Sequence, residues 1–142
     1  MKEKIEKIKS LNMNWMESNF FPPASDENIT EFEKENNVII PNSYKEFLLQ
    51  TNGAEIFGGD AYFYGVCGEI EHYINYDFTE GQVPKQLMIL GFYNDDHVCY
   101  DLHDDIFLFY NGEEYDSIKE ECEIFSDFGK VLDYIIDIAE NS

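Results

Sequence analysis

The chain has 142 residues and a formal net charge of −21, a length that suits one globular domain and leaves little room for a second. Thirty Asp and Glu stand against nine Lys, and Arg is absent from the sequence. Direct binding to a phosphate backbone depends on Lys and Arg that displace counterions, so this balance argues against nucleic acid and against an anionic membrane as partners. An apolar fraction of 44% indicates a folded acidic protein rather than a disordered one.

The first 54 residues predict helices. A helical spacing of apolar residues from Ile5 to Met16 ends before Pro22-Pro23, because proline lacks the amide proton and restrains the residue before it. Ser25 is a candidate N-cap of a second helix. We expect residues 1–24 to form an amphipathic helix with a Pro-Pro connector, followed by a single domain over residues 25–142.

A third helix is predicted after Pro41. Ser43 and Glu46 have the spacing of a capping box, and the apolar residues that follow lie three and four positions apart. Thr51-Asn52-Gly53 supplies the C-terminal stop of this helix, because glycine accepts the left-handed conformation.

From residue 55 the sequence favours strands. Short β-rich runs at 56–57 and 62–66 are followed by longer runs at 87–93, 98–102 and 106–110. The short acidic turns between the longer runs imply antiparallel neighbours, and Asn111-Gly112 is typical of a tight hairpin. A helix with one apolar face is expected from Ser126 onward. Helices, then a strand meander, then a helix predict the α+β class.

One run carries metal-compatible residues. His97, Cys99, Asp101 and His103 share a face if residues 97–103 form one strand. Alternate residues on a strand lie about 6.5–7 Å apart, so four in a row do not all reach one ion, and we predict no metal site. The alternative is a solvated polar face with Cys99 as a small residue at its buried edge.

Evidence for catalysis and for a secreted protein is absent from the sequence. Motifs of nucleophilic, phosphate-binding and zinc-dependent enzymes are missing, and paired carboxylates are expected by chance in so acidic a chain. We therefore predict no catalytic residue, no cofactor and no enzyme activity. The three cysteines show no paired spacing, and the charged N-terminus lacks a secretory apolar region, which predicts a cytoplasmic protein with reduced thiols.

A dense acidic stretch is the most informative feature. Residues 95–123 hold eleven acids against Lys119, with tyrosines interleaved among them. Tyrosine provides rigid contact area and carboxylates steer a basic partner, so this stretch suits a protein interface. The alternative is a solvated face with tyrosines in the core. The candidate partner-binding residues are Asp95, Asp96, Asp101, Asp104, Asp105, Glu113, Glu114, Asp116, Tyr93 and Tyr110.

The order of several short motifs resembles the SUKH superfamily (the Smi/Knr domain) over about residues 25–138. The motifs, in order, are Asn28-Ile29-Thr30-Glu31-Phe32-Glu33, Ile40-Pro41-Asn42-Ser43-Tyr44-Lys45-Glu46-Phe47-Leu48, Thr51-Asn52-Gly53-Ala54, Ile89-Leu90-Gly91, Tyr100-Asp101-Leu102 and Asp127-Phe128 with Leu132. The sequence departs from the family pattern at Ile40, where leucine is usual, and at Ala54, where a second glycine is usual.

The resemblance implies an α+β fold with helices against a curved, mainly antiparallel sheet. It also implies a binding role without catalytic residues, because bacterial members are mostly immunity proteins that neutralise a toxin domain, frequently a nuclease. We therefore expect a non-enzymatic immunity protein whose acidic sheet and loop surface docks on a toxin domain with a basic surface. The alternative is a housekeeping interaction or scaffold module of the same fold with no toxin partner. Whether the protein is a monomer or a dimer stays open.

Overall fold

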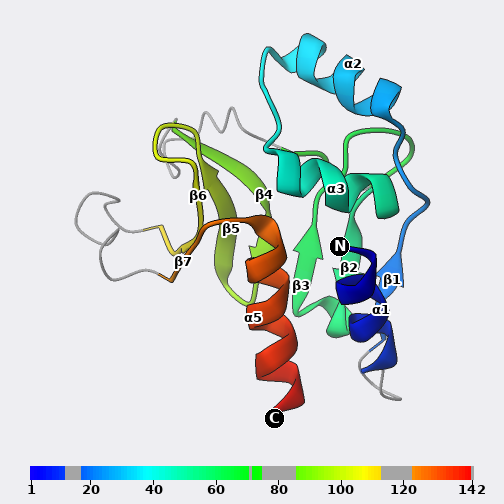
Figure 1. Cartoon of the computed structure of the whole chain (residues 1–142), viewed down its shortest axis with the longest axis vertical. Helices are drawn as coiled ribbons and strands as arrows, with labels where there is room; N and C mark the ends of the chain where they lie inside the picture. Colours follow the sequence, from blue (N-terminus) through cyan, green and yellow to red (C-terminus); the bar gives the residue numbers. More distant parts are fainter. Residues whose placement is uncertain (12–16, 71, 75–85, 113–122, 142) are drawn as a thin grey trace.

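The structure is a computed structural model, and it describes residues 1–11, 17–70, 72–74, 86–112 and 123–141 (Figure 1). The helices are α1 (Lys2–Ser10), α2 (Asp26–Asn36), α3 (Asn42–Gln50), the short 3-10 helix η1 (Phe57–Gly59) and α5 (Phe128–Glu140). The strands are β1 (Asn19–Phe20), β2 (Ala54–Ile56), β3 (Ala61–Phe63), β4 (Leu87–Tyr93), β5 (Asp96–Asp101), β6 (Ile106–Tyr110) and β7 (Ile124–Phe125).

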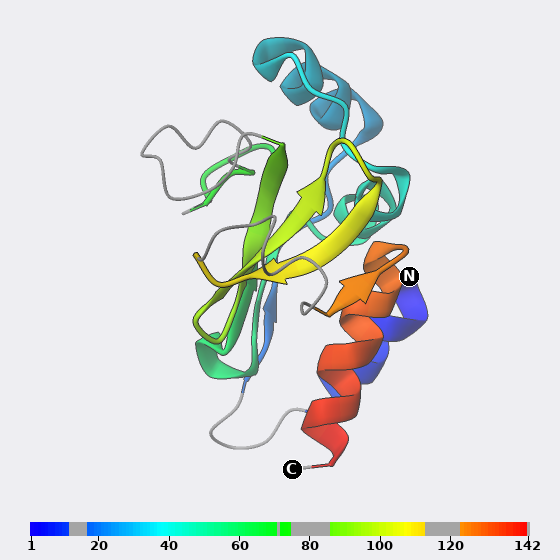
Figure 2. The same ribbon diagram turned by 90° about the vertical axis from the view of Figure 1, so that its left-hand side faces the viewer.

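The strands form one seven-stranded antiparallel sheet in chain order, β1 to β7. The helices α1 and α5 lie on one side of this sheet, as the two perpendicular views show (Figures 1 and 2). The short turns that join β4 to β5 and β5 to β6 allow only antiparallel pairing of these neighbours. The predicted α+β class and the antiparallel sheet are confirmed.

An aromatic cluster joins the helices to the sheet. The Phe128 ring at the start of α5 lies 4.7 Å from Tyr44 and 5.0 Å from Phe47 of α3, and 5.1 Å from Phe63 of β3 (centroid distances). All four side chains are fully buried. Edge-to-face contacts of this kind add roughly 0.5–1.5 kcal/mol each to the burial of the rings. The cluster therefore fixes the starts of α3 and α5 relative to each other.

The segment before residue 25 packs into the same core. Ile5 and Ile8 of α1 are buried in the main hydrophobic cluster. Lys4 of α1 forms an ion pair with Asp133 of α5 at 2.6 Å. The strand β1 extends the sheet beyond β2, and the sequence analysis did not predict it. It is only two residues long, too short for a recognisable alternation of apolar and polar positions.

The predicted helix starts have different outcomes. Ser25 caps α2 as predicted, because its side chain accepts a hydrogen bond from the Asn28 amide. The capping box at Ser43 is wrong, since α3 begins at Asn42 with Pro41 as its N-cap. The Ser43 hydroxyl instead accepts a hydrogen bond from the Phe128 amide at 2.9 Å, and so satisfies a donor at the start of α5.

Gly53, which follows α3, is needed because another strand lies close to it and not because it caps the helix. The helix stops at Gln50 as predicted, but its C-cap Thr51 is extended rather than left-handed. Gly53 has a φ of +93°, and a Cβ there would lie 2.6 Å from the Phe63 carbonyl oxygen. Close approach of β3 therefore excludes a side chain at this position.

The strand predictions were accurate where apolar runs are long. The runs at 87–93 and 106–110 are confirmed as β4 and β6, while β5 starts and ends earlier than the predicted 98–102. The tight hairpin at Asn111-Gly112 does not join β6 to the next described strand, because β6 pairs with β7 and residues 111–123 separate the two. The loop predicted at 81–84 lies outside the described residues.

Candidate protein-binding site

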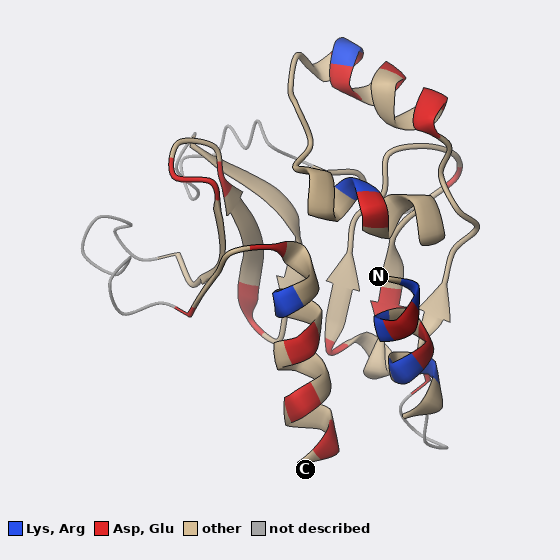
Figure 3. Ribbon diagram, in the orientation of Figure 1, with Lys and Arg blue, Asp and Glu red and all other residues tan. Residues whose placement is uncertain are grey.

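The exposed acids of the predicted surface form two groups at opposite ends of β5. Asp95 and Asp96 lie at the β4–β5 turn, and Asp104 and Asp105 lie at the β5–β6 turn (Figure 3). A strand of this length spans about 20 Å. The two turns are thus separate acidic features, and Glu113, Glu114 and Asp116 lie outside the described residues.

Asp101 and Tyr110 are part of the interior. Asp101 has 0% exposure, and its Oδ1 accepts hydrogen bonds from the amides of His103 at 2.8 Å and Asp104 at 3.1 Å. Its Oδ2 accepts a third bond from Gln86 at 3.0 Å. Tyr110 is buried in a second hydrophobic cluster on the sheet. Asp101 therefore holds the β5–β6 turn in shape, and neither side chain is presented at the surface.

Tyr93 is half-buried at the end of β4. Its ring lies 5.6 Å from that of Phe109, and burial raises the pKa of its hydroxyl. The partly exposed edge of Tyr93 is next to Asp96, its partner in the β4–β5 pairing. Of the two candidate tyrosines, Tyr93 is therefore the one with surface left for a partner.

The metal-compatible run does not form a chelating face. The strand β5 ends at Asp101, so His103 lies beyond it in the turn. Cys99 is fully buried, and burial raises the pKa of its thiol well above the ordinary range. The alternative of a solvated polar face with a buried Cys99 is therefore confirmed for Cys99 and wrong for Asp101, which is also fully buried. Among the described residues, no group of three or more potential metal ligands comes together.

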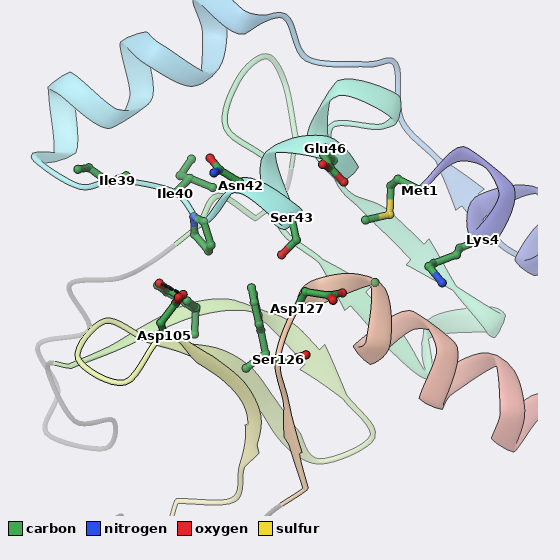
Figure 4. A pocket seen from close by; sticks show the side chains of 14 residues that line it. Met1, Lys4, Ile39, Ile40, Asn42, Ser43, Glu46, Asp105, Ser126 and Asp127 are labelled. Carbon is green, nitrogen blue, oxygen red and sulfur yellow. Dashed lines mark hydrogen bonds between the residues drawn. The ribbon is translucent and has the colours of Figure 1, made fainter.

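A cleft of about 620 Å³ opens beside the β5–β6 turn, between this turn and the first turns of α3 and α5 (Figure 4). Its apolar lining comes from the connector before α3 and from the sheet, with Ile39, Ile40, Pro41, Tyr100 and Phe107. Met1 and Lys4 of α1 close its far end, as the close-up shows. Clefts of this size are typical of sites that receive a ligand or a partner side chain.

Negative charge dominates the polar lining of the cleft. Among the described residues, three acids line it, Glu46, Asp105 and Asp127, together with one basic side chain, Lys4. Lys4 is already paired with Asp133, whereas none of the three lining carboxylates takes part in an ion pair within the described part of the chain. The cleft therefore carries an uncompensated negative charge.

Tyr100 and Asp105 form the wall on the strand side. The Tyr100 hydroxyl donates a hydrogen bond of 2.6 Å to Oδ1 of Asp105. Burial, this hydrogen bond and the nearby Asp105 carboxylate raise the pKa of Tyr100 to about 12. Asp105 has a φ of +54°, a left-handed conformation that Asp and Asn tolerate better than other side chains. The turn therefore holds a charged carboxylate in a fixed place at the cleft.

The opposite wall is the start of α5. Asp127 is its N-cap, and its Oδ1 accepts a hydrogen bond from the Lys130 amide at 3.1 Å. The Ser43 hydroxyl accepts from the Phe128 amide, so α3 and α5 are tied together at this edge. The carboxylates and apolar side chains among the described lining residues are suited to binding a charged or amphipathic group.

Sequence reasoning missed Ile39, the most exposed large apolar residue of the described chain. The exposed fractions of Val38, Ile39 and Ile40 are 9%, 77% and 0%. In an extended segment successive side chains point to opposite sides, so three consecutive apolar residues leave the middle one outward. That signal is present in the sequence as the apolar run Val38-Ile39-Ile40.

An aromatic group on the other side of the sheet was also missed. The ring centroid of His72 lies 4.9 Å from that of Tyr62 and 5.3 Å from that of Tyr64. Phe92 stacks on Tyr62 at 6.0 Å, and the two residues are directly paired between β3 and β4. The sequence alone could not show that these rings are neighbours, because residues 64–86 separate β3 from β4 along the chain.

Comparison with known proteins places this fold in a family. Residues 23–130 match the SMI1 / KNR4 family (SUKH-1), which covers most of the chain. The chain belongs to the SMI1/KNR4 family. The resemblance read from the sequence is therefore confirmed, and the matched residues include α2, α3, the whole sheet from β2 onward and the start of α5.

Two individual proteins are similar to this SMI1/KNR4 chain. Uncharacterized protein YnaB of Bacillus subtilis (strain 168) is 39% identical over 82 residues, which cover 58% of this chain and 53% of that protein. The chain thus spans about half the length of this curated relative. The crystal structure of a protein from Pseudomonas syringae pv. tomato superposes with a TM-score of 0.61 at 20% identity, over 90% of this chain and 92% of that one. The second likeness supports the fold alone.

Membrane insertion through a helix finds no support in this structure. Among the described residues, none of the helices has the length and apolar character that crossing a membrane requires.

Proposed function

We propose that this SMI1/KNR4 protein is a non-enzymatic immunity protein that binds and neutralises a toxin domain with a basic surface. The family membership supports a role in protein binding, and the resemblance described above links bacterial members to toxin neutralisation. In this proposal the protein acts in the cytoplasm, and its partner is a protein rather than nucleic acid or a membrane.

The observation that carries the proposal is the charge that the fold leaves uncompensated. The chain has thirty acids and nine lysines, and four of those lysines already form ion pairs with acids of the same chain. A toxin that acts on nucleic acid needs a basic surface to hold phosphates, and an acidic protein can occupy that surface. Complementary charge also speeds association, by up to several orders of magnitude at low salt.

The exposed acids at the two ends of β5 are the proposed contacts. Asp95, Asp104 and Asp105 are exposed, and Asp96 and Tyr93 are partly exposed beside them. An interface of standard size covers roughly 800 Å² of each partner, which is enough to reach from one end of β5 to the other. Asp101 and Tyr110 support this surface from within and are no longer proposed as contacts.

Co-expression tests the proposal directly. Each reading frame adjacent to the gene of this chain is expressed in a host cell, alone and together with the chain. We expect one of them to arrest growth alone, to be tolerated with the chain, and to co-purify with it in a defined stoichiometry. A toxic neighbour that this chain neither binds nor neutralises contradicts the proposal. A stable complex with a neighbour that is harmless when expressed alone favours the scaffold role instead.

A further inference from the structure

The cleft beside the β5–β6 turn combines two properties. One is an accessible apolar surface, formed by the exposed Ile39 and the partly exposed ring of Tyr100. The other is uncompensated charge, from Glu46, Asp105 and Asp127. Figure 4 shows Asp105 and Asp127 apart from each other below the connector and the start of α3, with Ile39 at the outer end of the connector.

An anion is the first occupant to weigh, because the N-termini of α3 and α5 both border the cleft. A helix N-terminus is equivalent to roughly half a positive charge, which is small against three carboxylates. Two amides at the start of α5 are also already satisfied, since Asp127 accepts from the Lys130 amide and Ser43 accepts from the Phe128 amide. The balance of charge therefore favours a cation.

We propose that the cleft binds a cationic side chain of the protein partner, with arginine preferred over lysine, and that an adjacent apolar residue of the partner covers Ile39. Arginine is preferred because its planar guanidinium stacks on aromatic rings and donates to two carboxylates at once. Tyr100 supplies a partly exposed ring, and Asp105 and Asp127 supply carboxylates at two places along the cleft. This inference deepens the proposed function, but its test uses no toxin.

Asp105→Asn is the variant that removes charge with the least structural change. Asparagine tolerates the positive φ of this position, and its side-chain oxygen still accepts the hydrogen bond from Tyr100. Glu35→Gln is the matched control. Glu35 is exposed on α2, does not line the cleft, and its change to glutamine removes the same single charge.

The probe is N-acetyl-arginine amide, titrated into the isotope-labelled full chain and followed by backbone amide chemical shifts. N-acetyl-citrulline amide has the same shape without the charge and serves as the matched neutral probe. We expect weak binding of the arginine probe, with the largest shifts at Ile39, Asp105 and Gly129. Citrulline should cause much smaller shifts, and added salt should weaken arginine binding.

The variants decide whether the cleft is responsible. Asp105→Asn should weaken binding of the arginine probe by about threefold or more, as expected on loss of one solvent-accessible charge interaction, while Glu35→Gln leaves it unchanged. Equal shifts with citrulline, shifts spread over α2 and the Asp95 turn, or an unchanged affinity of Asp105→Asn would overturn the inference. Such a result leaves the immunity role standing, because toxin neutralisation by another surface is measured separately in the co-expression test.

Discussion

Replacing Asp101 by alanine tests whether this acid supports the fold rather than contacts a partner. Its carboxylate is fully buried and accepts three hydrogen bonds, two from backbone amides of the β5–β6 turn and one from Gln86. A hydrogen bond to a charged group contributes roughly 1.5–3 kcal/mol, but the three share one carboxylate and do not add. The turn amides can also reach water once the side chain is gone. We therefore expect Asp101→Ala to lower the free energy of unfolding by about 3 kcal/mol.

Urea unfolding followed by far-UV circular dichroism measures this change. For a chain of this length 3 kcal/mol corresponds to a fall in Tm of roughly 6–12 °C. Asp101→Asn keeps an oxygen for the two turn amides and should cost only about 1 kcal/mol. Asp95→Ala, at an exposed position of the other turn, should stay within about 0.5 kcal/mol of the parent protein. If Asp101→Ala is as stable as Asp95→Ala, the structural role assigned to Asp101 is refuted.

Three further predictions concern the close approach of β3 and β4, the cleft and a helix cap. Gly91→Ala should lower the free energy of unfolding, measured in urea, by at least about 3 kcal/mol, because the new Cβ would lie 2.1 Å from the Tyr62 carbonyl oxygen. Gly59→Ala is the control: its Cβ would meet open space, but the φ of +102° is strained for alanine, so the loss should be at most about 2 kcal/mol. The pKa of Tyr100 is raised to about 12, so the folded state keeps this proton to a higher pH than the unfolded chain does, and the free energy of unfolding should fall as pH rises from the ordinary tyrosine pKa through 12. Tyr100→Phe should flatten that fall and remove a phenolate absorbance step near pH 12. An unchanged absorbance step contradicts the assignment. Ser25→Ala should cost about 1 kcal/mol through loss of the α2 cap, and a change below about 0.3 kcal/mol would show that this cap is not needed.

The elements that the sequence predicted well are those whose signals are local. The runs that became β4 and β6 are apolar over five or more residues, and Ser25 satisfies a donor three residues away. Ser43 had the same local signal, but its hydroxyl bonds the Phe128 amide, 85 residues along the chain. Local spacing cannot distinguish a cap of the same helix from a cap of a distant one.

The sequence located the exposed acids of the candidate surface but could not show which of its acids are buried. Acid density marked the β4–β5 and β5–β6 turns, where exposed acids do lie, but density along a sequence says nothing about which side of a strand a residue occupies. Asp101 is paired with Leu87 and Ile106 and shares their face of the sheet, where both Leu87 and Asp101 are fully buried. The cleft could not be predicted, because three segments far apart in sequence form it and only the folded chain brings them together. These segments are the connector before α3, the β5–β6 turn and the start of α5.

The central claim is that this protein neutralises a toxin by binding it and without catalysing a reaction. The most direct measurement is a titration of purified chain against the activity of the toxic neighbour found by co-expression. We predict that the activity falls linearly with added chain, reaches zero near one chain per toxin, and returns when the complex is dissociated. Loss of activity at far less than stoichiometric amounts, or loss that persists after the chain is removed, would mean that the chain acts as an enzyme and would contradict the account.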